Sequence, residues 1–342
     1  MSAINLNTIV DKKTGNSIEV GDIIKVVGVA TIFQKTMVNE PAFRVESGVI
    51  VANGDLEVTV NSTVVSIADG ASVTMPAMAA GTDYAIYATA SGLVASNNFT
   101  NPSGFTADDS RRIGGFHYQD GVINDRSIWD LKFKPSAKDP RGMALVIGDS
   151  FWADIYLLNT TPDLLGTSAY NAQIADGSSC PKIPLAWGGN GTEQYSAFTQ
   201  YIATEVLSAY GKRLPNQHEF SVLAKGSVPG HAAGVDPVKT KFDVSARSVV
   251  GCEQVSGHLW QWGSECWDRG DGSTGYGWQE VNTNEQGQVY ASGANGVGAS
   301  LFGALWDDAG FAGSCASTWD GGPWTSNSNI SARGVCDHVI LP

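Results

Sequence analysis

The chain has 342 residues, of which 42% are hydrophobic and 16% are charged, so it is long enough for two or three domains with substantial cores. Its formal net charge of −13, together with the absence of any basic cluster of five or more residues, argues against nucleic acid as a partner. The N-terminus lacks the basic-then-apolar pattern of a signal peptide, and no apolar run approaches the ~20 residues of a membrane helix. We therefore expect cytoplasmic synthesis without a signal peptide and no membrane insertion.

Residues 1–41 contain two β-type runs, at 23–27 and 29–33, separated from their surroundings by Gly-Asn and Gly-Asp turn signals. The pattern predicts a short N-terminal β module that serves attachment or oligomerisation. An additional hairpin belonging to the next domain explains the same pattern, and both interpretations stay open at this point.

Residues 42–136 show short apolar runs between Gly, Asn and Asp turns, which is typical of an antiparallel β-sandwich. His117 stands between two aromatic residues near the end of a further strand, and we expect it to have a packed structural role. A segment with two prolines at 134–140 predicts a linker to the next domain. The expected strands are Val49–Val51, Leu56–Val60, Val64–Ile67, Val73–Met75 and Tyr84–Ala88.

Residues 137–342 combine short strands with two predicted helices, which indicates a mixed α+β domain. Apolar residues at helical spacing run from Thr192 to Tyr210, and Gly211 is a natural helix stop. Asn216 followed three residues later by Glu219 has the pattern of a capping box for the second helix. The residues expected on the buried face of that helix are Phe220, Leu223 and Ala224.

The five cysteines are odd in number, irregularly spaced and without a CxxC pair. A zinc site or a disulfide framework is therefore not expected, and free thiols are favoured. A bridge between Cys252 and Cys266 is left open. The residues from 140 onward also lack the Glu-Pro-Asn and Gln-Pro-Asp tripeptides of calcium-dependent sugar sites. We expect neither a metal nor a cofactor.

Tryptophans, glycines and short polar residues dominate the stretch from Gly303 to Pro342. Every second position from Leu305 to Phe311 carries a residue of different chemical character. On a strand these side chains would share one face, with Trp306 on the opposite face. A mixed face beside tryptophans suggests a surface on which residue identity is free while the backbone is fixed. The apolar residues from Val335 to Leu341 then predict a buried closing strand.

Several long strings resemble the major tropism determinant family, whose members are receptor-binding proteins of phage tail fibres. They occur in the family's order over residues 42–342, and they are TMPAMAAGTDYAIY (74–87), RRIGGFHY (111–118), SIWDLKFKPSAKDPRGMALV (127–146), FWADIYLL (151–158), GKRLPNQHEF (211–220) and ARGVCDHVIL (332–341). The resemblance implies a β-rich α+β fold whose C-terminal domain is C-type-lectin-like, of the formylglycine-generating-enzyme branch. It also implies a homotrimer at the tail-fibre tip of a virion that binds a host cell-surface protein or glycan.

The resemblance further implies which residues bind the receptor, because in that family a retroelement rewrites adenines in AAY-type codons. Such codons cannot yield Lys, Glu, Gln, Met or Trp, and none of these five occurs at the matching positions here. Trp306, Trp319 and Trp324 are expected to form a supporting aromatic frame. The matching positions are Leu305, Asp307, Ala309, Phe311, Thr318, Asp320, Gly321, Thr325, Asn327, Asn329 and Ile330.

Two enzyme classes and one further binding class are alternatives. A formylglycine-generating oxidase needs two closely spaced cysteines, but Cys315 and Cys336 are far apart in the sequence. A serine hydrolase is disfavoured because there is no GxSxG motif, and because adjacent residues such as Asp337 and His338 point to opposite faces of a strand. A cell-surface adhesin with the same fold remains open. We expect a binding protein without enzymatic activity.

Overall fold

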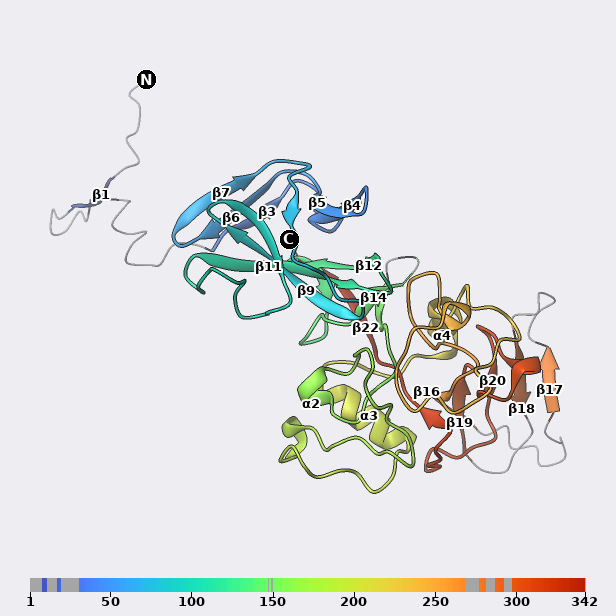
Figure 1. Cartoon of the computed structure of the whole chain (residues 1–342). Coiled ribbons are helices and arrows are strands. Elements are labelled where there is room, and N and C mark those ends of the chain that lie inside the picture. Colours follow the sequence, from blue (N-terminus) through green and yellow to red (C-terminus); the bar gives the residue numbers. More distant parts are fainter. Residues whose placement is uncertain are drawn as a thin grey trace.

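The computed structural model describes residues 31–146, 148, 150–267, 287–291 and 297–341, and the strands β1 (Thr8–Val10), β2 (Ser17–Glu19) and β17 (Gly277–Glu280). β1 and β2 form an antiparallel pair. The run expected at 23–27 and the start of the run at 29–33 lie outside the described residues. From residue 31 onward, a β-rich body and a mixed α/β body lie side by side (Figure 1).

The first body is a β-sandwich, as predicted, with three sheets that enclose one apolar core. Its largest sheet has the order β12 (Ile123–Asp130), β11 (Ser110–Tyr118), β9 (Thr82–Thr89), β10 (Gly92–Ser96), β8 (Val73–Thr74). The smaller sheets are β3 (Phe33–Lys35), β6 (Leu56–Val60), β7 (Thr63–Ile67), and β4 (Phe43–Glu46), β5 (Val49–Ala52). β6 has the predicted bounds, and the other expected strands differ by at most two residues at either end.

Residues assigned from the sequence to the N-terminal module contribute to this sandwich, because β3 pairs with β6. Lys35 on β3 is buried, and its Nζ lies 2.8 Å from Asp130 Oδ2. His117 is also buried, with Nδ1 2.9 Å from Asp83 Oδ1 and Nε2 3.0 Å from the Tyr156 hydroxyl oxygen. These contacts confirm the structural role expected for His117.

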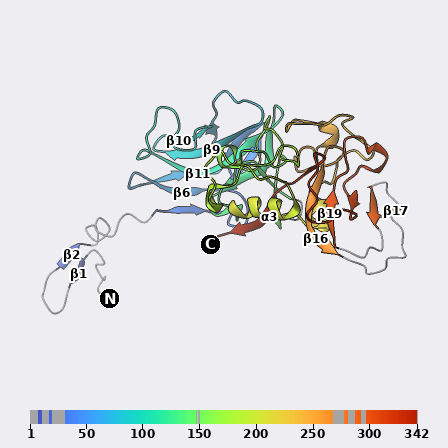
Figure 2. The ribbon, with the colours of Figure 1, turned by 90° about the horizontal axis from the view of Figure 1, so that it is seen from below.

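A four-stranded sheet joins the two bodies, in the order β13 (Phe133–Pro135), β22 (Val335–Ile340), β15 (Phe151–Asp154), β14 (Met143–Leu145). The segment expected as a linker therefore begins inside a strand, β13. The last strand, β22, lies between β13 and β15, which places the C-terminus beside the sandwich (Figures 1 and 2). Only Val335 and Cys336, the first two residues of β22, are buried; Ile340 is 45% exposed and Leu341 beyond it 41%. The expectation of a closing strand buried to Leu341 is thus wrong beyond Cys336.

The α-helices of the second body are α2 (Pro162–Leu165), α3 (Gln200–Ala209) and α4 (Gln217–Leu223). α3 lies alongside β16 (Trp260–Trp267) (Figure 2). It begins eight residues later than predicted, because the Thr199 hydroxyl accepts a hydrogen bond from the Ile202 amide and caps the helix there. Tyr201, expected on its apolar face, is 60% exposed.

The helix α4 has the predicted capping box. The Asn216 side chain accepts from the Glu219 amide at 2.9 Å, and the Glu219 carboxylate accepts from the Asn216 amide at 3.0 Å. Gly211 has a φ of +74°, as expected for a helix stop. The predicted buried face of α4 is confirmed by Phe220, Leu223 and Ala224.

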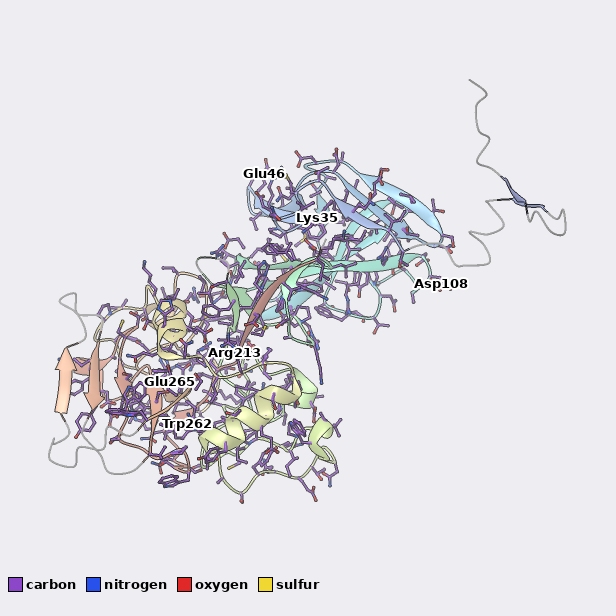
Figure 3. The ribbon with its side chains drawn as sticks, turned by 180° about the vertical axis from the view of Figure 1, so that it is seen from behind. Lys35, Glu46, Asp108, Arg213, Trp262 and Glu265 are labelled. Atoms are coloured by element: carbon purple, nitrogen blue, oxygen red, sulfur yellow. The ribbon has the colours of Figure 1, made fainter. Side chains whose placement is uncertain are left out.

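The main sheet of the second body has six strands. Their order is β17, β18 (Gln288–Ala291), β20 (Ser317–Thr318), β19 (Gly298–Phe302), β16, β21 (Ile330–Ser331). Trp262 on β16 is fully buried in the core between this sheet and α3 (Figure 3). Three 3-10 helices complete the body: η1 (Leu185–Trp187), η2 (Val244–Ala246) and η3 (Ala309–Phe311).

Buried cations hold the interior of this body together. Arg333 is fully buried, and its guanidinium donates to the carbonyl oxygens of Asp154, Ile155 and Glu253. Lys212 is buried too, and its ammonium group donates to the Asp154 carboxylate. Arg213 is exposed, and its guanidinium makes two hydrogen bonds of 2.7 Å to the Glu219 carboxylate.

All five cysteines are free thiols, so the Cys252–Cys266 bridge considered from the sequence does not form. Cys252 is buried while Cys266 is exposed. Within the described part of the chain, no helix is long and apolar enough to span a bilayer.

Candidate functional site

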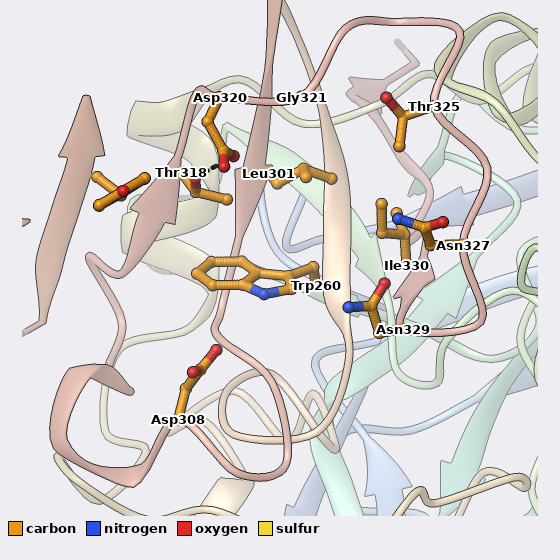
Figure 4. Close-up of a pocket in the computed structure, with 11 residues that line it drawn as sticks. Trp260, Leu301, Asp308, Thr318, Asp320, Gly321, Thr325, Asn327, Asn329 and Ile330 are labelled. Atoms are coloured by element: carbon orange, nitrogen blue, oxygen red, sulfur yellow. Dashed lines mark hydrogen bonds between the residues drawn. The ribbon is translucent and has the colours of Figure 1, made fainter. Parts of the chain in front are cut away.

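A cavity of about 380 Å³ opens on the six-stranded sheet, between the segment at 305–312 and the segment at 319–330 (Figure 4). Its volume is at the lower end of the range for small-ligand pockets. The lining comes from strands β16, β18, β19, β20, β21 and the two segments. The lining residues are Trp260, Tyr290, Leu301, Asp308, Thr318, Asp320, Gly321, Thr325, Asn327, Asn329 and Ile330.

The floor of the cavity belongs to the domain core. Trp260, Leu301 and Ile330 are only 7%, 4% and 3% exposed, and all three lie in one apolar cluster. Trp260 on β16 is the register partner of Ile330 on the parallel strand β21. A rigid apolar base therefore supports the polar rim.

Main-chain hydrogen bonds hold the backbone of the rim. The Ala299 amide donates to the Gly321 carbonyl at 2.7 Å, and the Trp260 amide to the Asn329 carbonyl at 3.0 Å. The Gly177 amide donates to the Asn327 carbonyl at 2.9 Å. Because these bonds use carbonyl oxygens, they do not depend on which side chain occupies position 321, 327 or 329.

Residues between the rim positions reinforce this attachment. The Ser326 hydroxyl accepts from the Phe198 amide at 2.8 Å, and the Pro323 carbonyl accepts from the Gln200 amide at 3.1 Å. A side chain at Gly177 would place its Cβ 2.5 Å from the Asn327 backbone, so this contact requires glycine. The first turn of α3 thus positions the rim.

Two carboxylates, Asp308 and Asp320, are among the polar groups of the cavity. The Thr318 hydroxyl donates to Asp320 Oδ1 at 2.7 Å, and the Leu305 amide donates to Asp308 Oδ2 at 3.2 Å. Burial, with a smaller effect from the charge of Asp307, raises the pKa of the Asp308 carboxyl above its usual value. Asn329 Oδ1 is buried and has no hydrogen-bond partner among the described residues.

The structure brings seven of the eleven sequence-predicted positions to the cavity. These are Thr318, Asp320, Gly321, Thr325, Asn327, Asn329 and Ile330. Ile330 differs from the expectation of a freely variable surface residue, since its side chain is buried in the core. The remaining four, Leu305, Asp307, Ala309 and Phe311, do not line it.

The predicted alternation on a strand from Leu305 to Phe311 is wrong. The chain forms a turn there, followed by η3. The Asp308 carboxylate accepts from the Leu305 amide, and the Asp308 carbonyl accepts from the Phe311 amide at 2.8 Å. Asp308 therefore closes the turn from both sides, as aspartate commonly does.

The three tryptophans of the expected aromatic frame have different environments. Trp306 is partly buried against Leu157, Ile174 and Leu259. The indole of Trp319 donates to the Ser317 hydroxyl oxygen at 3.2 Å, which fits a supporting role. Trp324 is 64% exposed and therefore does not support the sheet. Its side chain is instead available at the surface beside the rim.

Sequence reasoning missed four lining residues: Trp260, Tyr290, Leu301 and Asp308. Three of them come from strands upstream of the C-terminal stretch, and only strand pairing brings them to the cavity. The Asp-Asp-Ala-Gly run was a turn signal that would have placed Asp308 inside the segment.

Metal ligands and thiol reactivity bear on the enzyme alternatives. Among the residues that the structure describes, no group of three His, Cys, Asp or Glu side chains is placed to hold a metal ion. Burial raises the pKa of the Cys336 thiol, which disfavours the reactive thiolate.

Comparisons with known proteins agree with this architecture. Residues 36–128 match a family model described as the Mtd second domain. The tail fiber receptor-binding protein of Bordetella phage BPP-1 is 43% identical over 307 residues, which cover 83% of this chain and 78% of that protein.

Solved structures give the same result across both bodies. The Major Tropism Determinant I1 variant superposes with a TM-score of 0.83 at 37% identity, covering 98% of this chain and 95% of that chain. For the P3c variant the TM-score is 0.82 at 38% identity, and the superposition covers 98% of this chain and 93% of the P3c chain. The second body accordingly has the C-type-lectin-like fold. The chain belongs to the major tropism determinant family.

Proposed function

We propose that this chain is the receptor-binding protein of a phage tail fibre, and that the rim of the cavity binds a host cell-surface receptor. The observation that carries this proposal is the separation of rim side chains from the main-chain bonds that hold them. A binding surface built in this way changes its side chains without changing its shape. Antibody paratopes solve the same problem with small polar and aromatic residues on a rigid scaffold.

A retroelement that diversifies the gene would act on this rim. The seven positions at the cavity share a backbone held by residues outside the diversified set, among them Gly177, Trp260 and Ala299. The residue types at the eleven positions are compatible with AAY-derived codons. A second gene copy of the coding region for 305–330 that differs only at adenines, near a reverse-transcriptase gene, is the expected genomic context. A copy that differs at all four bases would contradict it.

Homotrimer formation at the tail-fibre tip is the second part of the proposal. One small cavity provides few contacts, and three copies on one fibre would raise the effective affinity through multivalency. Sedimentation equilibrium of the purified chain should give three times the 36.0 kDa monomer mass. A monomer at micromolar concentration would contradict this part alone.

Binding of the fluorescently labelled protein to cells tests the central proposal. The strains should include the bacterium in which the gene is found, and flow cytometry gives the readout. A variant with Asp320→Ser, Thr325→Ser and Asn327→Ser should lose binding, because it changes the rim and leaves its main-chain bonds in place. The matched control carries Glu46→Ser, Val64→Ser and Asp108→Ser, all at exposed positions of the sandwich. Equal binding by both triple variants would refute the proposal.

A further inference from the structure

The rim and floor of the cavity combine carboxylates with an aromatic ring. Figure 4 shows the carboxylates of Asp308 and Asp320 on either side of the Trp260 ring, with Asn329 next to the indole. The described lining contains no lysine or arginine, so no side chain of the cavity itself neutralises the two carboxylates. The whole chain is also negatively charged, with a formal net charge of −13.

We propose that the cavity takes a cationic side chain, lysine or arginine, presented by a protein receptor. This inference rests on the proposed receptor-binding function and specifies the chemistry of the ligand. An ammonium or guanidinium group placed over the Trp260 ring would gain a cation–π contact, and the flanking carboxylates would accept its N–H donors.

The hydrogen bonds already made in the cavity leave acceptor capacity for such a ligand. Asp308 Oδ2 and Asp320 Oδ1 each accept one hydrogen bond from within the chain. A carboxylate offers about four acceptor sites. Asn329 also lines the cavity, and its Oδ1 is buried with no hydrogen-bond partner among the described residues. A guanidinium with five N–H donors matches this surplus of acceptors.

Electrostatics favours a cation over a neutral sugar, although aromatic and amide side chains occur in sugar sites as well. A ligand that covers the cavity removes water from both carboxylates, and Asp308 is already partly buried. A neutral sugar would leave these two negative charges desolvated and uncompensated, which is costly. A cation compensates them and is also attracted by the net charge of the chain.

The proposed cation site combines constant positions with variable ones. Asp308 and Trp260 lie outside the eleven positions, whereas Asp320 is one of them. A constant half of the site would then favour cationic partners in general, and residue 320 would set how strongly each one binds. Replacement of Asp320 by a neutral residue should weaken binding of a cation without abolishing it.

Ligand-observed NMR and isothermal titration calorimetry with small probes test this assignment. The cationic probes are N-acetyl-arginine methylamide and N-acetyl-lysine methylamide. N-acetyl-citrulline methylamide is the neutral isostere of the first, and a set of methyl glycosides represents neutral sugars. We expect the two cations to bind and the citrulline probe to bind at least about tenfold more weakly, the weight of one charge-assisted hydrogen bond.

Conservative variants locate the binding on the chain. Asp308→Asn and Asp320→Asn retain an oxygen that can accept from the Leu305 amide or the Thr318 hydroxyl, so the local fold is preserved. Each should weaken the arginine probe about tenfold. Glu193→Gln removes one charge at an exposed position of the same domain, away from the cavity, and should leave the affinity unchanged.

The outcomes separate this inference from the receptor-binding proposal. Equal affinity for the arginine and citrulline probes, or an equal loss in Glu193→Gln, would overturn the cationic assignment. Binding of a glycoside without binding of the cations would also overturn it and identify a sugar site. Cell binding with no cation binding leaves the receptor-binding proposal intact. If the cationic probes bind but the protein binds to no bacterial strain, the cationic assignment of the cavity holds and the receptor-binding proposal is refuted.

Discussion

Side chains at the floor of the cavity should stabilise the domain, whereas side chains at its rim should face a partner, and Ile330→Ala tests this distinction. Ile330 is 3% exposed and packs in the same cluster as Trp260 and Leu301. Truncation of a buried isoleucine to alanine costs about 2–5 kcal/mol. For a domain of about 200 residues, each kcal/mol lowers the Tm by roughly 2–4 °C. We expect a decrease in Tm of roughly 4–20 °C.

The rim variant with Asp320→Ser, Thr325→Ser and Asn327→Ser is the comparison. Exposed substitutions usually change stability by within about half a kcal/mol each, so its Tm should move by only a few degrees. Differential scanning calorimetry measures both proteins. If the rim variant loses as much stability as Ile330→Ala, the rim side chains are structural and the reasoning fails. An unchanged Tm in Ile330→Ala would restore position 330 to the freely variable set.

Four further predictions concern the scaffold. Arg333→Lys should lower the free energy of unfolding by about 2–4 kcal/mol in a urea titration, because an ammonium cannot reach all the oxygens to which the guanidinium donates; an unchanged midpoint would contradict it. Iodoacetamide at neutral pH should modify the exposed Cys266 and spare Cys252, since burial raises the pKa of the Cys252 thiol to about 11, and denatured protein should titrate as five thiols. Because the pKa of the Cys252 thiol is higher in the folded chain, the unfolded chain loses this proton at lower pH, and the free energy of unfolding therefore falls as pH rises from about 9 to 11. Urea titrations at alkaline pH should show this decrease, and Cys252→Ala should remove the part of it that comes from Cys252. Asn216→Ala should cost about 1 kcal/mol through loss of the α4 cap, while Asn216→Ser should cost less.

Local patterns predicted the elements whose determinants are close in sequence. β6 follows an alternating apolar run between two turns, and α4 begins at the cap that Asn216 and Glu219 form three residues apart. The apolar spacing predicts too early a start for α3, because Phe198 fits that spacing. Phe198 is buried, but the Thr199 cap excludes it from the helix.

The cavity itself was only half predictable. Seven positions followed from the family resemblance, but the floor did not, because Trp260 and Leu301 reach it through strand pairing that spacing does not encode. The error at 305–311 has a local cause. Residues of mixed character fit an exposed strand and a polar turn equally well, and the hydrogen bonds of Asp308 decide between them.

The position of β22 has a consequence for how the protein folds. Its partners β13 and β15 lie roughly two hundred residues earlier in the chain, so this sheet is among the most non-local pairings in the structure. Contacts of such long range form slowly, because a large loop must close first. The segment at 305–330 is part of that loop. Pairing of β22 with β15 leaves this segment inside the closed loop, so slow hydrogen exchange in β22 of a chain with a new set of rim residues would show that the sheet between the two bodies still forms.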